Sequence, residues 1–311
     1  MTYAVRRSWL IVPAHNTRAL AEAAGSRADV VVLDLQDTVH ESRKHEARAN
    51  VRGAIDTMRD AGSEVFVRSD VELIYADFDV SVWRGLSGVA LPGVTCVDQV
   101  LEADDILTMF EAERGVVKPP PVGQVREADD PRGPDQALEI HLSLDTGPGN
   151  WHAEDLIRAS DRVRSVSLGR ADLVMDLREE PSGDLHLLPY LMQRLIVIAN
   201  ATDVEPVGAW WRATSRGLVA SYDDTLQAAV TGRLAGFRGA LCMRANQVEA
   251  LNLGFTPSAS EIERHSASLQ ANDSATPFAE ISSGVIAWAD ACATRDEVGD
   301  LVRGHLQSAS D

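Results

Sequence analysis

Short apolar segments that resemble β-strands alternate along this chain with longer segments of helical periodicity. Val30–Leu35 is apolar at nearly every position, which is typical of a parallel strand covered on both faces. The expected strands are residues 8–13, 30–35, 64–68, 88–92, 140–144, 164–168, 206–211 and 239–243. About eight strand–helix pairs in roughly 250 residues are the count of an α/β fold of the (β/α)8 TIM-barrel type. We expect residues 1–255 to form the barrel and residues 256–311 to form a C-terminal helical extension.

Two carboxylates follow consecutive expected strands. Asp145 ends an alternating strand and precedes a glycine turn, and Asp172 comes three residues after Gly169, where the next strand breaks. α/β barrels place their chemistry at the carboxyl ends of the strands. Two such carboxylates can bind one hard cation through oxygen ligands, whereas each one alone is equally typical of a helix cap. The pair therefore predicts a metal site, with capping as the alternative.

Charge and cysteine content exclude several classes of function. The chain has 311 residues and a formal net charge of −18, so its surface should repel nucleic acids and anionic membranes. Its three cysteines lie far apart, which fits a reducing compartment and neither a disulfide framework nor a zinc site. No apolar run approaches the roughly 20 residues that cross a bilayer, and the first one is too short for a signal peptide. We expect a cytoplasmic protein.

Three local patterns give further expectations. Gly115–Gln136 is rich in proline and charge, and we expect an exposed loop or flap there. The GPGN segment at 147–150 is interpreted as a turn that opens toward the metal. Trp210 and Trp211 fall in the seventh expected strand, where side chains alternate between faces, so at most one of them can contact a ligand.

Several motifs occur in a fixed order along the chain. LDLQDTV occupies residues 33–39, Lys44 and Arg48 lie one turn apart on an expected helix, and Arg68 ends the third strand. The most specific motif is GFRGALCMRANQVEALNLGFTPSASEIE at residues 236–263. Together with Arg7-Ser8, Asp145 and Gly169…Asp172, this series resembles the citrate lyase β-subunit and malyl-CoA lyase group of the HpcH/HpaI aldolase superfamily, from about residue 6 to 265.

The resemblance implies a Mg²⁺-dependent carbon–carbon lyase. By position, Asp145 and Asp172 would be the metal ligands, and Arg68 would clamp a substrate carboxylate. Gln36 and Asp37 would line the outer shell of the metal and join Arg68 as catalytic residues. A divalent cation suits the reaction because cleavage needs an electrophile that stabilises an enolate-like oxygen.

The resemblance also implies the ligands and the assembly. The substrate would be a small hydroxy or oxo acid or its acyl thioester, carried by CoA or an acyl-carrier protein. The implied substrate-binding residues are Arg7, Arg68, Gly169, Arg244 and Trp210. Members of this group form homo-oligomers, commonly trimers or hexamers, in which the C-terminal extension packs on a neighbouring subunit.

The chain departs from the family pattern at several of these positions. Gln36 replaces a glutamate, Asp145 is one methylene shorter than the usual glutamate, Gly93 replaces a lysine and Arg244 replaces a histidine. These changes leave two alternatives open: altered chemistry such as thioester hydrolysis, or a ligand-binding role without catalysis.

Overall fold

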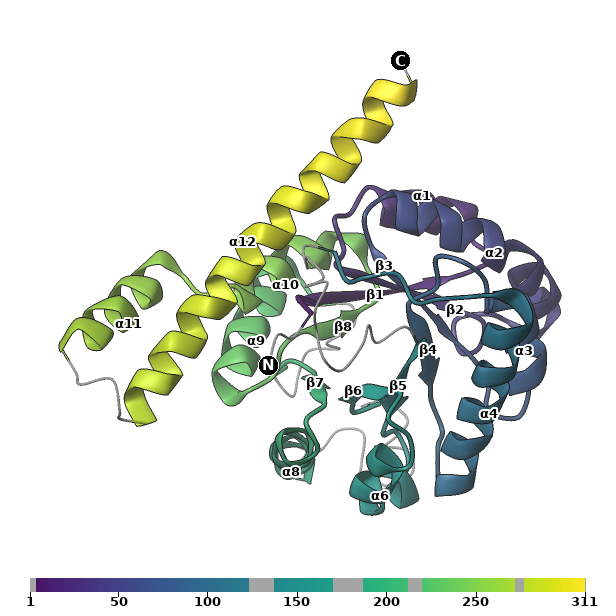
Figure 1. The fold of residues 1–311 in the computed structure, drawn as a ribbon, viewed down its shortest axis with the longest axis horizontal. Coiled ribbons are helices and arrows are strands. Elements are labelled where there is room, and N and C mark those ends of the chain that lie inside the picture. Colours follow the sequence, from purple (N-terminus) through teal and green to yellow (C-terminus); the bar gives the residue numbers. More distant parts are fainter. Residues whose placement is uncertain (1–3, 123–136, 170–186, 212–219, 272–276, 311) are drawn as a thin grey trace.

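Eight parallel strands form a barrel surrounded by helices in the computed structural model, which describes residues 4–122, 137–169, 187–211, 220–271 and 277–310 (Figure 1). The strands are β1 Ser8–Pro13, β2 Val30–Asp34, β3 Glu64–Arg68, β4 Gly88–Leu91, β5 Glu139–Ser143, β6 Val163–Ser167, β7 Glu205–Val207 and β8 Ala240–Cys242. β1 pairs with both β2 and β8, and a single bridge between Val207 and Gly239 joins β7 to the β8 end of the sheet. The predicted TIM barrel is confirmed.

The helices follow the strands as the periodicity predicted. They are α1 Thr17–Ala24, α2 Lys44–Asp60, α3 Ile74–Ser81, α4 Val97–Arg114, α5 Gly147–Trp151, α6 Ala153–Arg158, α8 Leu187–Thr202, α9 Tyr222–Ala235, α10 Val248–Phe255, α11 Ala259–Ala271 and α12 Pro277–Ser310. Asn16 caps α1, because its side chain accepts a hydrogen bond from the backbone N–H of Ala19. The turn expected at 147–150 is wrong: the segment starts α5, which Thr146 caps by accepting from the N–H of Gly149.

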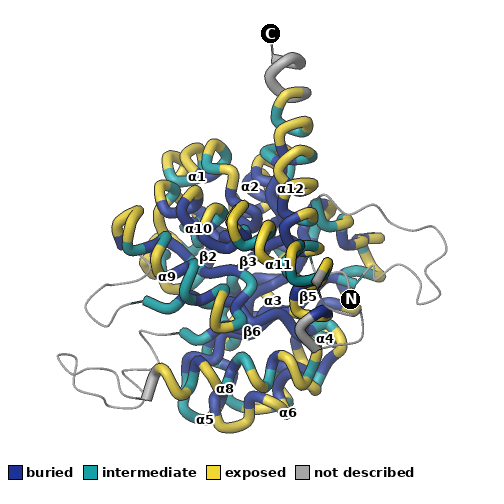
Figure 2. Tube along the Cα trace, turned by 90° about the vertical axis from the view of Figure 1, so that its left-hand side faces the viewer, coloured by how far each residue is buried: buried dark blue, intermediate teal, exposed yellow. Residues whose placement is uncertain are grey.

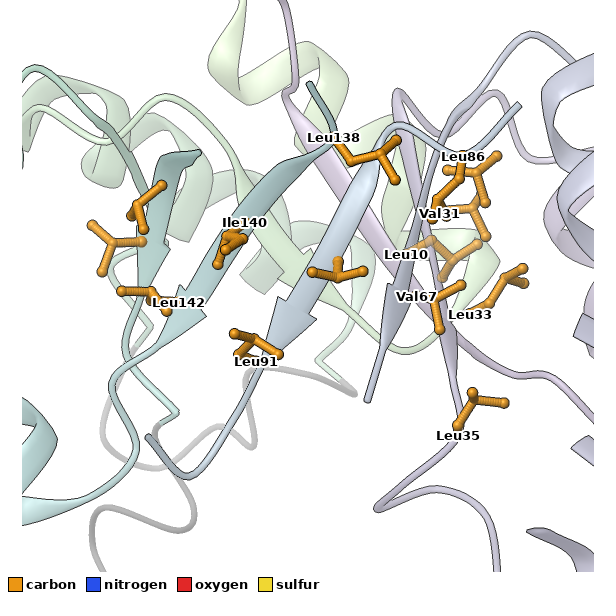
Figure 3. Close-up of a cluster of buried hydrophobic side chains, with 14 of the residues drawn as sticks. Leu10, Val31, Leu33, Leu35, Val67, Leu86, Leu91, Leu138, Ile140 and Leu142 are labelled. Carbon is orange, nitrogen blue, oxygen red and sulfur yellow. The ribbon is translucent and has the colours of Figure 1, made fainter. Parts of the chain in front are cut away.

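The largest core lies between the barrel and its helices. Figure 3 shows outward-facing side chains of this core, among them Val31, Leu33, Val67 and Leu142, which are all fully buried. A strand sends alternate residues to opposite faces, so Val32 and Phe66 fill the inside of the barrel instead.

A layer of charged side chains fills the barrel at the amino ends of its strands. Arg6, on the segment that leads into β1, bonds to Glu64 of β3 at 2.7 Å and to Glu139 of β5 at 2.6 Å. Glu205 of β7 lies 3.8 Å from the same guanidinium, so the four residues come from alternate strands. Lys118 adds a second cation, 2.8 Å from Glu139. Residues 123–136 lie outside the described residues, but an exposed loop starting at Gly115 is wrong, because Lys118 is buried in this ion pair.

The environment shifts the pKa values of two carboxyl groups in this layer in opposite directions. Arg6 and Lys118 oppose the effect of burial at Glu139 and hold its pKa at about 2. At Glu205 burial prevails over the attraction of Arg6, and with the neighbouring carboxylates it raises the pKa to about 8. Glu205 is therefore neutral in the folded chain near pH 7, while Glu139 is ionised.

Helix α12 crosses the amino end of the barrel and projects beyond it, where the tube in Figure 2 is largely exposed. Its middle packs on the barrel of the same chain: Trp288 Nε1 donates to the carbonyl oxygen of Phe255, at 2.9 Å. Arg295, which is 3 % exposed, donates to the carbonyl oxygens of Asp29 and Gly62. Among the helices in the described ranges, none combines the length and the apolar character that a bilayer requires.

Candidate active site

An arginine and two aspartates meet at the carboxyl ends of β2 and β3. Asp34 and Arg68 are partners in the register of these strands, and both point into the barrel. The guanidinium of Arg68 contacts the carboxylate of Asp37 and lies 3.8 Å from that of Asp34. Asp34 is fixed in turn by Thr38, whose backbone N–H and hydroxyl both donate to it. The structure therefore brings the predicted Arg68 and Asp37 together.

Gln36 lies in the same loop and leaves one oxygen unused. Its backbone N–H donates to Asp34 Oδ1 at 3.0 Å. Its side-chain Oε1 is buried and has no hydrogen-bond partner among the described residues. A buried oxygen without a donor costs free energy, typically about 1 to 3 kcal/mol. A bound ligand or water that donates to Gln36 would remove this cost.

Asp145 follows β5 at the same end of the barrel and is 3 % exposed. Its Oδ1 accepts a hydrogen bond from the backbone N–H of Gly93, at 2.7 Å. The chain after β6 passes so close that a Cβ at Gly169 would lie 2.1 Å from the Cβ of Asp145, so only glycine fits there. Asp172, the other predicted ligand, lies outside the described residues. Within the described ranges, no three Asp, Glu, His or Cys side chains converge as a metal-binding set.

Lys44 and Arg48 support the loop that follows Arg68. Arg48 bonds to the buried carboxylate of Asp77 at 2.8 Å, and Asp77 accepts from the backbone N–H of Asp70. Lys44 lies 3.8 Å from Asp70. The shared helical face of Lys44 and Arg48 thus fixes the backbone two residues beyond Arg68.

A histidine inside the barrel, which sequence reasoning missed, lies below this site. His141 of β5 is 2 % exposed, and its ring nitrogens lie 2.8 Å from Ser165 Oγ and 2.9 Å from Ser167 Oγ. Burial lowers the pKa of His141 to about 3, with Arg6 and Arg68 acting in the same direction. The period-two pattern of β5 could have revealed His141, because it places this residue on the inward face of the strand with Ser143.

Two predicted substrate-binding residues lie on the rim at the carboxyl end. Arg244 is exposed, just after β8. Trp210 comes after β7 and is half-buried, and its backbone N–H donates to the carbonyl oxygen of Ala228 in α9. The expected alternation of Trp210 and Trp211 is wrong, since β7 ends at Val207 and both side chains pack against the outer core.

Arg7 lies elsewhere. It precedes β1 at the amino end of the barrel, is 1 % exposed, and forms ion pairs with Asp29 at 2.8 Å and with Asp296 of α12 at 2.6 Å. The structure does not bring it together with Arg68 or Asp145, which lie at the carboxyl ends of the strands. These ion pairs give Arg7 a structural function, joining β1 to the C-terminal extension.

The barrel, with polar residues gathered at the carboxyl ends of its strands, has the arrangement of a TIM-barrel enzyme. Beyond this class, the chain belongs to the HpcH/HpaI aldolase/citrate lyase family, whose model matches residues 7–245. It is 28% identical over 183 residues to an L-malyl-CoA/beta-methylmalyl-CoA lyase of Cereibacter sphaeroides, covering 57% of this chain and 52% of that protein. The chain thus spans about half the length of that relative.

Other relatives match over more of their length. The chain is 24% identical over 261 residues to the citrate lyase subunit beta of Leuconostoc mesenteroides subsp. cremoris, covering 83% of this chain and 79% of that subunit. Among solved structures, protein CitE from Mycobacterium tuberculosis in complex with magnesium, acetoacetate and coenzyme A has a TM-score of 0.65 at 18% identity. That likeness covers 93% of this chain and 97% of the other and supports the fold.

Proposed function

We propose that this protein is a Mg²⁺-dependent carbon–carbon lyase that acts on a small hydroxy or oxo acid or its acyl thioester. The observation that carries the proposal is the pairing of Arg68, a carboxylate-binding side chain, with the exposed Asp37 and the buried Asp34 at the carboxyl end of a family barrel. The names of the relatives support it, since they are lyases of malyl-CoA and a citrate lyase subunit.

The residues at this end of the barrel fit a magnesium ion. Asp145 supplies a buried carboxylate, and Gly169 keeps the neighbouring chain close to it. Asp172 would supply the second carboxylate, a proposal that rests on its sequence spacing from Gly169. Mg²⁺ is commonly bound by one or two carboxylates, with water and substrate oxygens in the remaining positions. When bound, the ion would stabilise negative charge on an enolate-like substrate oxygen.

The chain's own residues would bind and orient the acid. Arg68 is suited to hold a substrate carboxylate through two parallel hydrogen bonds, because its guanidinium is planar. Asp34 and Asp37 keep it at the mouth in the absence of substrate. Gln36 Oε1 can accept a hydrogen bond from a hydroxyl or water, but the neutral amide cannot act as a general base. Arg244 and Trp210 would line the rim, and Arg7 has no part in this proposal.

Arg68→Lys tests the clamp. Lysine keeps the charge but loses the planar fork, so we expect kcat/KM to fall at least about tenfold, or roughly 1.4 kcal/mol. The free energy of unfolding should change by less than about 1 kcal/mol. A variant that loses stability while its activity per folded molecule stays unchanged would make Arg68 a structural residue.

Magnesium titration tests the metal site. Asp145→Asn and Asp172→Asn should each weaken Mg²⁺ binding in calorimetry, because each removes a charged oxygen ligand. Asp155→Asn, on the exposed face of α6, is the matched control and should bind Mg²⁺ like the wild type. Unchanged affinity in both site variants would contradict the proposal.

The thioester carrier and the assembly belong to the same proposal. We propose CoA or an acyl-carrier protein as the carrier, and a homotrimer or hexamer in which α11 and α12 contact a neighbouring subunit. The projection of α12 beyond the barrel and the exposed Ile281 and Leu301 on it support the contact. Light scattering on purified protein measures the assembly directly.

A further inference from the structure

The pair of serines that holds His141 limits the imidazole to two arrangements of protons. The pKa of His141 lies far below neutrality, so the ring carries one N–H donor and one acceptor nitrogen. Both nitrogens face serine hydroxyls, at 2.8 Å for Ser165 and 2.9 Å for Ser167. One serine must therefore donate its proton to the ring, and the other must accept the ring N–H. In the described part of the chain, neither hydroxyl has another side-chain partner.

The serine that accepts from the ring keeps a proton for another acceptor. Both serines are buried, at 0 % exposed for Ser165 and 1 % for Ser167, but Ser165 lies two positions further from the carboxyl end of β6, so its proton would point into the barrel interior. A buried donor without an acceptor is destabilising. The favoured arrangement has the Ser165 hydroxyl donating to Nδ1, and Nε2–H donating to Ser167. The free proton then belongs to Ser167.

Ser167 is the one of the two serines that lies at the carboxyl end of its strand, beside Asp145. It ends β6 and is the register partner of Ser143, two residues before Asp145. The carbonyl oxygen of Ser167 accepts from the N–H of Leu144, the residue before Asp145, at 2.7 Å. Gly169, two residues on, is packed against Asp145 itself.

We propose that the Ser167 hydroxyl, oriented by His141, donates a hydrogen bond to a carboxylate or carbonyl oxygen of the acid bound at the barrel mouth. Ser167 is then a substrate-binding residue and His141 a positioning residue. This inference rests on the proposed function, because it requires an oxo acid at that site. It adds a neutral, directional donor to the charged clamp of Arg68, and so favours ligands with an acceptor oxygen on the β6 side.

The test compares two serine-to-alanine variants, each of which removes one of the two hydroxyl groups that contact His141. Pyruvate, with saturating Mg²⁺, is the probe in calorimetric titrations. Ser167→Ala should weaken pyruvate binding at least about tenfold, the loss expected for a hydrogen bond to a charged acceptor. Ser165→Ala keeps the Ser167 hydroxyl and removes only the group that fixes the ring, so it should weaken pyruvate binding clearly less than Ser167→Ala does. Ser167→Thr keeps the hydroxyl and should restore most of the affinity.

Nitrogen NMR of histidine-labelled protein reads the proton arrangement without a ligand. We expect the signals of a neutral ring protonated at Nε2, and a ring protonated at Nδ1 would overturn the inference. Equal losses of pyruvate binding in Ser165→Ala and Ser167→Ala would also overturn it and would leave the network a packing role. Absence of Mg²⁺-supported pyruvate binding in the wild type would instead refute the proposed function, and this inference with it.

Discussion

Replacing Glu205 by glutamine tests the charge balance at the base of the barrel. Three carboxylates share Arg6 and Lys118 there, and Glu205 has the longest contact, at 3.8 Å, while Glu64 and Glu139 lie 2.7 and 2.6 Å from Arg6. Burial, together with the neighbouring carboxylates, raises the pKa of Glu205 to about 8 against the attraction of Arg6. The folded chain therefore holds a proton that the unfolded chain, with an ordinary pKa of 4.5, releases.

The magnitude follows from these two pKa values. Because the folded state binds the extra proton, the free energy of unfolding falls as pH rises from the lower value to the higher, by about 1.4 kcal/mol per pH unit, and then levels off. Glutamine is neutral at every pH and removes this loss. Relative to the wild type, Glu205→Gln should gain at least about 1 and at most about 3 kcal/mol between pH 6 and pH 9.

Urea unfolding followed by circular dichroism, at several pH values across that range, measures the difference. Glu139→Gln is the matched control: the pKa of Glu139 is about 2, so its charge is needed by Arg6 and Lys118 throughout. Its loss should cost about 3 to 5 kcal/mol at every pH. A constant difference between Glu205→Gln and the wild type, or a loss as large as that of Glu139→Gln, would refute the reasoning.

Two further substitutions test close packing and the C-terminal helix. Gly169→Ala should lower the free energy of unfolding by about 1 to 3 kcal/mol and weaken Mg²⁺ binding, since its Cβ would collide with Asp145. Gly284→Ala, with nothing within 4 Å, is its control in urea unfolding and should be neutral or slightly stabilising. Arg295→Ala should cost about 3 kcal/mol or more by removing buried bonds to the barrel. Arg43→Ala, in an exposed ion pair, should cost less than about 1 kcal/mol, and equal losses would contradict a buried anchor.

Local patterns predicted the elements where local interactions decide the structure. The strands Ser8–Pro13 and Glu64–Arg68 have the predicted bounds, and Asn16 caps α1 through a hydrogen bond to a residue three positions away. Their apolar alternation and capping chemistry depend on residues close in sequence. β7 is shorter than predicted, because Trp210 leaves the strand and bonds to α9 instead. A contact between segments distant in sequence, such as this one, cannot be predicted from the residues of the strand alone.

The candidate site divides in the same way. Arg68 and Asp37 meet as their positions at neighbouring strand ends predicted. Asp34 and His141 were missed, because a polar residue inside an apolar strand signals a function only when the barrel shows what it faces. Arg7 was predicted to bind substrate from its position in the motif series. Its ion pairs with distant residues hold it at the other end of the barrel.

The charged layer at the base of the barrel also bears on the order in which the chain folds. Arg6 precedes β1, and its three carboxylate neighbours come from β3, β5 and β7, so both halves of the chain must be in place before Arg6 has all its partners. Dehydrating Arg6 before Glu64 and Glu139 have reached it would leave an uncompensated charge in the interior, whereas Glu205 joins the layer as a neutral side chain. The early strands can pair with their neighbours, but the charged layer is complete only when β7 has joined the sheet. Closure of the barrel is therefore a late and cooperative step, since non-local contacts repay their chain entropy only once the distant segments have met.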